Sequence, residues 1–381
     1  MKKITLLAAF LSCALVLSPS VHAGGFMAVE QNASGLGVAY AGAAASADNA
    51  GTLYYNPAGL TQLPGAQLSV GLVGAQSRYE FDDDGSVGLV GGEGGQAGQW
   101  RGLPHVYASW AVNADWSLGL GVSSPYSLDT EYDDDWLGRN TGVSARLSSL
   151  NINPALAYRI SDRVSVGLGL NYQQIRLKTA LNAMRDSDTD SAWGWNVGAL
   201  FTLSPEMRLG LAYRSGMDYR LDANASALQA FPGVDGRGRF KTPDVFSLSV
   251  WQQVSERWEA MGDISWANWD RVEGYDHDSW RLSWGAAYTY NEHWKSKFGI
   301  AYDRSPIRTA ERGVLLADAH RLWLAIGGQY RFGKYATLDF GYAYQRAREA
   351  RLDQAQGAGL RLKGNYDASG HVIGVQYNQG F

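Results

Sequence analysis

From about residue 66 onward, apolar and polar residues alternate with a period of two, in long blocks. In 207–214, every second residue from Met207 to Tyr213 is apolar, and the residues of the other parity include Arg208 and Arg214. A period of two places successive side chains on opposite faces of a β-strand. The alternation therefore predicts an all-β chain whose strands have one apolar and one polar face.

A polar second face on so many strands does not suit the core of a β-sandwich. It suits a closed barrel whose apolar face meets lipid and whose other face lines the lumen. The chain has 46 Gly, 14 Trp and 21 Tyr, and Trp and Tyr concentrate at the two interfaces of such barrels. Beyond the N-terminus, no apolar run is long enough for a membrane-spanning helix.

Tight turns alternate with longer polar segments along the chain, which predicts a transmembrane antiparallel barrel of 14 strands with both ends on the tight-turn side. We expect tight turns near 113–115, 161–163, 204–206, 255–257, 291–293 and 332–334. We expect long loops near 80–99, 126–142, 182–190, 221–240, 270–278, 305–318 and 348–366.

The block 163–181 is longer than the roughly 9–11 residues of a tilted membrane-spanning strand. Its lipid-facing parity turns polar at Arg176 and Lys178, where the luminal parity turns apolar at Ile175 and Leu177. The block predicts a barrel that projects above the membrane with an apolar lumen. We expect Ile175 and Leu177 to contact a hydrophobic ligand there.

The N-terminus predicts export. Lys2 and Lys3 precede an apolar run, and Val21-His22-Ala23 supplies small residues for cleavage, so we expect 1–23 to be a signal peptide. The sole cysteine, Cys13, would leave with it, and the mature chain would carry a net charge of about −6, which argues against nucleic acid as a partner.

Residues 24–64 lack the alternation and are rich in Gly, Ala, Ser and Asn. From composition alone, this segment is either a disordered leader or a plug folded inside the barrel.

Several motifs resemble the FadL-type family of long-chain fatty acid and aromatic hydrocarbon transporters of the Gram-negative outer membrane. Together they span nearly all of 24–381. The motifs are Gly25-Phe26, Ser34-Gly35-Leu36-Gly37, Asn56-Pro57-Ala58, 133–139, 151–159, 210–215 and 299–306.

The resemblance implies a 14-stranded barrel over 65–381 and a hatch over 24–64. It implies that Phe26 reaches into a lipid-binding pocket, and we expect truncation of Phe26 to weaken ligand binding. It also implies that the hatch, with Gly35, Gly37 and Asn56-Pro57-Ala58, controls a lateral opening in the barrel wall. The ligand would leave through this opening into the membrane.

The chain departs from the family pattern in two places. Gln379 stands two residues before the terminal Phe381, where a hydrophobic residue is common, and the segment 182–190 is short. The family's carboxylate-binding cations match no motif here. Long-chain fatty acids and aromatic hydrocarbons therefore both remain candidate substrates, with fatty acids preferred.

Four cations have luminal parity and could pair with a ligand carboxylate. They could equally pair with luminal acids such as Asp263, Asp303 and Asp339. The four cations are Arg208, Arg214, Lys297 and Arg321.

No enzymatic constellation stands out. The six His are scattered without ligand spacing, so we expect no metal and no cofactor. A barrel lipid hydrolase would need a Ser–His pair that the sequence does not establish. A general diffusion porin is a further alternative, but such porins have wider barrels without a plug.

The remaining expectations concern partners. The acidic runs 82–84 and 133–135 either bind divalent ions that bridge lipopolysaccharide or are solvated loops. Phe381 ends an alternating strand, which suits recognition by the outer-membrane assembly machinery. We expect a monomer surrounded by outer-membrane lipids.

Overall fold

The computed structural model describes residues 25–222, 224–275, 277–307, 312–347, 350–356 and 359–381. The expected signal peptide, 1–23, lies outside the described residues. None of the helices in the described ranges is long and apolar enough to cross a membrane.

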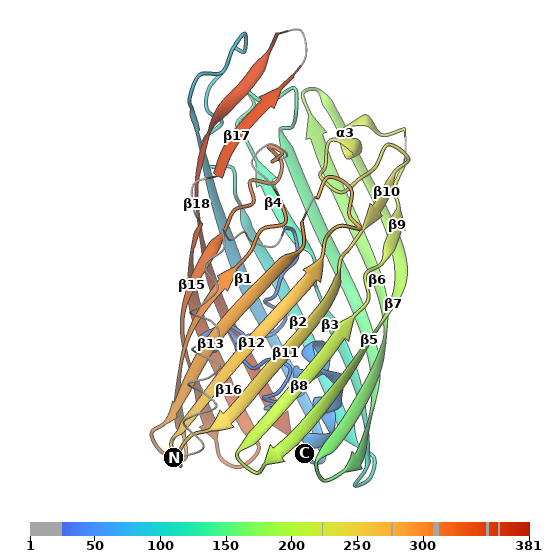
Figure 1. Cartoon of the computed structure of the whole chain (residues 1–381), viewed down its shortest axis with the longest axis vertical. Coiled ribbons are helices and arrows are strands. Elements are labelled where there is room, and N and C mark those ends of the chain that lie inside the picture. Colours follow the sequence, from blue (N-terminus) through green and yellow to red (C-terminus); the bar gives the residue numbers. More distant parts are fainter. Residues whose placement is uncertain (1–24, 223, 276, 308–311, 348–349, 357–358) are drawn as a thin grey trace.

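Fourteen antiparallel strands of the described chain form one closed barrel, in which the first strand pairs with the last (Figure 1). The predicted fold is confirmed. The wall strands are β1 (Ala66–Asp83), β2 (Trp100–Ala111), β3 (Trp116–Ser123), β5 (Ser144–Ser161), β6 (Val164–Leu181), β7 (Met184–Ser204), β8 (Met207–Arg214), β11 (Asp244–Gln253), β12 (Trp258–Asn268), β13 (Ser279–Thr289), β14 (Trp294–Asp303), β15 (Arg321–Phe332), β16 (Ala336–Ala347) and β18 (Arg361–Gly380).

Four short strands lie outside this count. β4 (Ser127–Glu131) pairs with β5, and β17 (Ala350–Ala355) pairs with the upper part of β18. β9 (Asp218–Arg220) and β10 (Arg239–Lys241) form a separate hairpin next to the one-turn helix α3 (Ser226–Gln229). These elements belong to the long loops at one end of the barrel, which is the extracellular end in barrels of this kind.

The barrel wall is much taller on one side than on the other (Figure 1). β1, β5, β6, β7 and β18 have 18 to 21 residues, whereas β8 and β11 have 8 and 10. The long strand predicted at 163–181 is present as β6. Ile175 and Leu177 face inward and are fully buried, while Arg176 and Lys178 are exposed outside.

The prediction of a long loop at 182–190 is wrong. β6 and β7 pair to their tips and are joined by a tight turn in which Asn182 has a φ of 50°. The acidic, serine-rich run resembles a loop, but its carboxylates bind neighbouring backbone. Asp186, Asp188 and Asp190 accept backbone N–H groups of the 218–230 segment at 2.9, 2.7 and 2.7 Å. These bonds satisfy polar groups that a local reading assigns to solvent.

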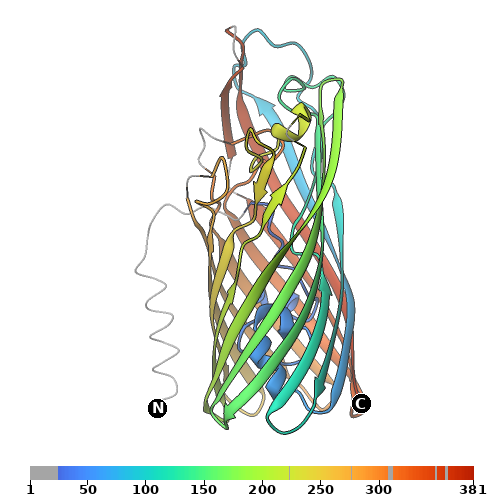
Figure 2. The same cartoon turned by 90° about the vertical axis from the view of Figure 1, so that its right-hand side faces the viewer.

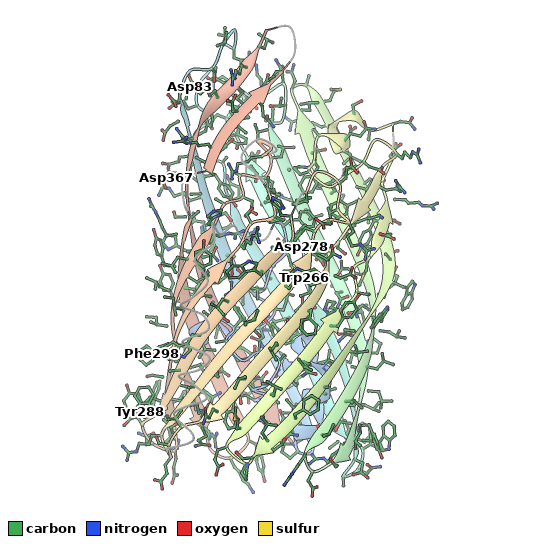
Figure 3. The ribbon with its side chains drawn as sticks, viewed as in Figure 1. Asp83, Trp266, Asp278, Tyr288, Phe298 and Asp367 are labelled. Atoms are coloured by element: carbon green, nitrogen blue, oxygen red, sulfur yellow. The ribbon has the colours of Figure 1, made fainter. Side chains whose placement is uncertain are left out.

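The outer face is a belt of exposed apolar side chains bordered by aromatic residues, as expected for contact with lipid. Phe298 and Tyr288 project outward near the tight-turn end, and Trp266 projects higher on the wall (Figure 3). Trp266 Nε1 donates to Asp278 Oδ2 at 3.1 Å, so the indole joins the apolar belt to the polar rim.

Residues 25–63 lie inside the barrel, with their helical turns in its lower part (Figure 2). They form η1 (Leu36–Val38), α2 (Thr52–Tyr55) and η2 (Pro57–Gln62), joined by turns. The segment is attached to the wall at separate points: Ala33 N donates to Gln376 Oε1 at 3.0 Å, and Ala44 N donates to Ser249 Oγ at 3.0 Å. We use the word hatch for residues 25–63.

Wall glycines leave the space that the hatch fills. Gly327, Gly341 and Gly374 are register partners across β15, β16 and β18. A Cβ on Gly327 would lie 2.8 Å from Gly37 Cα, and one on Gly374 would lie 2.9 Å from Ala33 Cβ. A glycine inside a strand often marks such a close approach of another backbone.

Candidate functional site

Phe26 lies in an aromatic cluster inside the upper barrel and is only 1% exposed. Its ring centroid is 5.1 to 6.1 Å from those of five other rings, in edge-on or tilted arrangements that aromatic pairs prefer. The five rings are those of Tyr126, Phe231, Phe240, Trp269 and Tyr275. Ile175 and Leu177 belong to the same buried cluster. The structure therefore brings together the three apolar residues predicted to contact ligand.

A cavity adjoins Phe26 between the hatch and the wall. Gly25, Met27, Glu30 and Tyr54 line its hatch side. Its wall side carries apolar groups such as Val245 and Trp323, together with five arginines. These are Arg101, Arg214, Arg281, Arg304 and Arg321.

The arginines of this upper cavity are fixed by neighbouring groups. Arg214 lies 4.3 Å above the Tyr54 ring, and its Nη2 donates to the Tyr54 carbonyl at 2.8 Å. Arg281 is paired with Asp303, and its Nη2 also donates to the Ala39 carbonyl at 3.0 Å. Arg214 also donates to the side-chain oxygen of Asn171, and no ion pair joins it to an acid among the described residues.

Arg321 is held by Asp318, a buried carboxylate of the loop between β14 and β15, at 2.9 Å. Asp318 also accepts hydrogen bonds from Gly25 N at 2.8 Å and from Ser305 Oγ at 2.6 Å. Burial raises the pKa of Asp318, although Arg321 and these donors lower it. Asp318 thus joins the loop, the wall and the first residue of the hatch.

The other two predicted cations lie elsewhere. Lys297 Nζ is 2.7 Å from Asp339 Oδ1 and 2.9 Å from the Ser34 carbonyl, in a separate polar cavity beneath the hatch. Arg208 stacks on Trp251, with 4.1 Å between the guanidinium carbon and the ring centroid. Lys297 therefore has the acidic partner that the alternative interpretation of the sequence foresaw.

Three cavity arginines were missed by sequence reasoning. Arg281 lies on the polar parity of 280–289, so parity could have indicated it. Arg101 lies near the start of β2 and Arg304 follows the end of β14, where parity is not informative.

The wall is interrupted next to this cavity. β2 and β3 pair only from Val106↔Val122 to Ala111↔Ser117, so residues 100–105 lack ladder partners on the β3 side. The chain leaves β3 after Ser123 and resumes as β4 at Ser127. Arg101 and Leu128, one on each side of the interruption, both line the upper cavity. The cavity therefore reaches the break in the wall.

The hatch binds the free edge at this break. Ala28 N donates to the Pro125 carbonyl at 2.8 Å, and Ser127 N donates to the Phe26 carbonyl at 3.1 Å. The segment 26–28 thus pairs with the stretch of chain that leads from β3 to β4.

The predicted gating residues lie lower in the barrel. Gly35 N donates a turn hydrogen bond, whereas Gly37 packs on the Gly327 backbone. Asn56 Nδ2 donates to the Ala44 carbonyl at 2.7 Å and to the Ala199 carbonyl of β7 at 3.0 Å, and Asn56 Oδ1 caps η2 through Ala58 N. Pro57 and Ala58 pack on β6 at Gly167. The Asn56-Pro57-Ala58 motif thus contacts β6 and β7. The hatch residues at the break in the wall are instead 26–31. The gating role of 56–58 stays a prediction.

In the described part of the chain, no group of three or more His, Cys, Asp or Glu could hold a metal ion.

At the C-terminus, Phe381 is 76% exposed, and its N–H donates to the Ala66 carbonyl at 2.9 Å. Its recognition by the assembly machinery stays a prediction.

Comparison with known proteins identifies the family. A family of outer membrane transport proteins, described as OMPP1/FadL/TodX, matches residues 14–381. Outer membrane protein P1 of Haemophilus influenzae is 28% identical, with 96% of this chain and 97% of the relative aligned. The long-chain fatty acid transport protein of Escherichia coli K12 is 25% identical, with 89% and 91% aligned.

Solved structures show the same fold. The chain is similar to a Pseudomonas aeruginosa FadL homologue with a TM-score of 0.83 and 22% identity, covering 94% of this chain and all of that one. It is similar to the Pseudomonas putida toluene transporter TodX with a TM-score of 0.68 and 18% identity, at the same coverage. The family match confirms the resemblance found in the sequence, and the chain belongs to the FadL/TodX family of outer-membrane proteins, which transport hydrophobic compounds and are not enzymes.

Proposed function

We propose that this protein takes up long-chain fatty acids through the outer membrane. The observation that carries the proposal is the composition of one connected interior. Its upper part is the aromatic and aliphatic cluster around Phe26, and the adjoining cavity carries five arginines. The first part has the apolar chemistry of an alkyl chain, and the second has the positive charge that a carboxylate requires.

The charges of the upper cavity favour an anionic group. Glu30 and Asp303 are the acids that line it, and Asp318 pairs with Arg321 from outside the lining. Cations therefore exceed acids in a place largely shielded from water. An arginine–carboxylate pair is among the stronger polar interactions, so a ligand carboxylate would be stabilised here more than a neutral group.

The proposed route runs from the extracellular loops to the cavity and then sideways. The break between β2 and β4 adjoins the cavity, and the hatch lies across the lumen below it. A hydrophobic molecule that leaves sideways enters lipid without crossing water. We further propose that 24–64 acts as a hatch for the barrel of 65–381, and that passage is passive diffusion.

Uptake of radiolabelled palmitate by cells that lack their own transporter tests the proposal. Arg214→Gln removes a cation of the upper cavity, whereas Arg208→Gln removes the same charge lower on the same strand. A hydrogen bond to a charged group contributes ~1.5–3 kcal/mol, so Arg214→Gln should lower palmitate uptake at limiting concentration at least about tenfold. Arg208→Gln should have little effect. Wild-type rates in both variants, with normal amounts of folded barrel, would contradict the proposal.

Aromatic hydrocarbon uptake is the second candidate function. The ring cluster around Phe26 favours it, as does the similarity to a structure described as a toluene transporter. The same cells distinguish the two candidates, because toluene uptake should not depend on Arg214. Rapid toluene uptake without palmitate uptake would favour the hydrocarbon.

A further inference from the structure

Glu30 is a carboxylate buried beside the arginines of the upper cavity. Its side chain lines the cavity and is 3% exposed. In the part of the chain that the structure describes, its carboxylate accepts one hydrogen bond, a long one of 3.5 Å from Gln345 Nε2. A buried carboxylate with so weak a partner is costly unless nearby charge compensates it.

Two arginines share the cavity with Glu30 without pairing with it directly. Glu30 lines the same cavity as Arg214 and Arg281. No ion pair joins it to them among the described residues, so Glu30 occupies the positive cavity without being fixed in it.

The segment that carries Glu30 also carries Phe26. Phe26 fills the aromatic cluster. Glu30, four residues further along the chain, lines the cavity that contains the arginines. One short piece of hatch thus places an apolar group and a carboxylate in the two environments that a fatty acid would occupy. Any fatty acid bound there would contend with both groups.

We propose that residues 26–30 act as a tethered mimic of the ligand, in which Glu30 competes with the carboxylate of an incoming fatty acid. This inference rests on the proposed function, because it presumes an anionic ligand. Displacement of the segment would also break the bonds that Phe26 and Ala28 make with residues 125–127 at the break in the wall.

The test compares affinities for decanoate and for decanol, measured by calorimetry on the purified full-length protein in detergent. Glu30→Gln keeps the shape of the side chain and removes the competing charge. It should tighten decanoate binding about tenfold, which is ~1.4 kcal/mol, and leave decanol binding unchanged. Glu259→Gln is the matched control, because it removes a luminal carboxylate that lines the lower cavity and pairs with Lys295.

Three results would overturn the inference. Decanoate affinity could be unchanged or weaker in Glu30→Gln, decanol binding could tighten equally, or Glu259→Gln could produce the same gain through net charge alone. The altered gel mobility of unboiled samples shows that each barrel is folded. If the wild type prefers decanoate and loses that preference in Arg214→Gln, the proposed function stands whatever Glu30 does. If no variant distinguishes decanoate from decanol, both fail.

Discussion

Truncation of Phe26 tests whether the hatch occupies the ligand site or helps to form it. From the sequence, we expected Phe26→Ala to weaken ligand binding. The buried ring favours the opposite prediction, because the ring itself fills the cluster. A ligand that enters the cluster must first displace Phe26, whereas in Phe26→Ala it finds the space already vacant.

The size of the effect follows from the burial of the ring. Replacing a buried Phe by Ala removes ~3–5 kcal/mol of packing, and an apolar cavity left behind can bind an apolar molecule. The wild type expends that free energy on displacing the ring, and Phe26→Ala does not. If the ligand regains half of it, decanol should bind about tenfold more tightly or better, at ~1.4 kcal/mol per factor of ten.

Tryptophan fluorescence provides the assay, because the Trp269 ring lies 5.1 Å from that of Phe26. Phe298→Ala is the control, since it deletes the same side chain from the lipid-facing wall, where it is visible in Figure 3. Its decanol affinity should equal that of the wild type. Weaker decanol binding by folded Phe26→Ala would refute the reasoning and return Phe26 to the role of a ligand contact.

Three further changes test the hatch and its loops. Gly327→Val places side-chain atoms against Gly37, an overpacking of ~1–3 kcal/mol, and should raise single-channel conductance in planar bilayers. Gly262→Val should not, because the nearest atom to an added Cβ there is the Ser283 carbonyl oxygen at 3.9 Å. Asp318→Ala leaves a Gly25 N–H without its acceptor and should speed hydrogen exchange in the residues that follow. Unchanged exchange would count against an anchoring role for Asp318. Backbone N–H groups lower the pKa of Asp235 to about 2. At a pH above its ordinary pKa, this carboxylate therefore stabilises the β9–β10 hairpin. The stabilisation is lost as the pH falls through about 2. Asp235→Asn should therefore speed exchange in that hairpin at pH 7 but not below pH 2.

The wall of the barrel could be predicted from the sequence because the alternation within each strand shows which of its two faces is apolar. Alternation in 207–214 places Arg208 and Arg214 inside, and the six tight turns lie between the strands where turn-forming residues indicated them. Where polar residues pair with distant backbone, as at Asp186, the local pattern resembles a loop. The strand there depends on the 218–230 segment, which no local reading can include.

The composition of the site was decided by the tertiary structure. Parity says whether a side chain points into the lumen, but not at what height or beside which neighbour, because the stagger between strands is a property of the closed barrel. Arg208 and Arg214 share a strand and a parity, yet only Arg214 lines the upper cavity. The break after Ser123 and the place of Glu30 among the arginines arise in the same way, from contacts between segments far apart in the chain. The sequence by itself determined a lipid-facing barrel with a polar interior, and closure around the hatch determined which residues meet there.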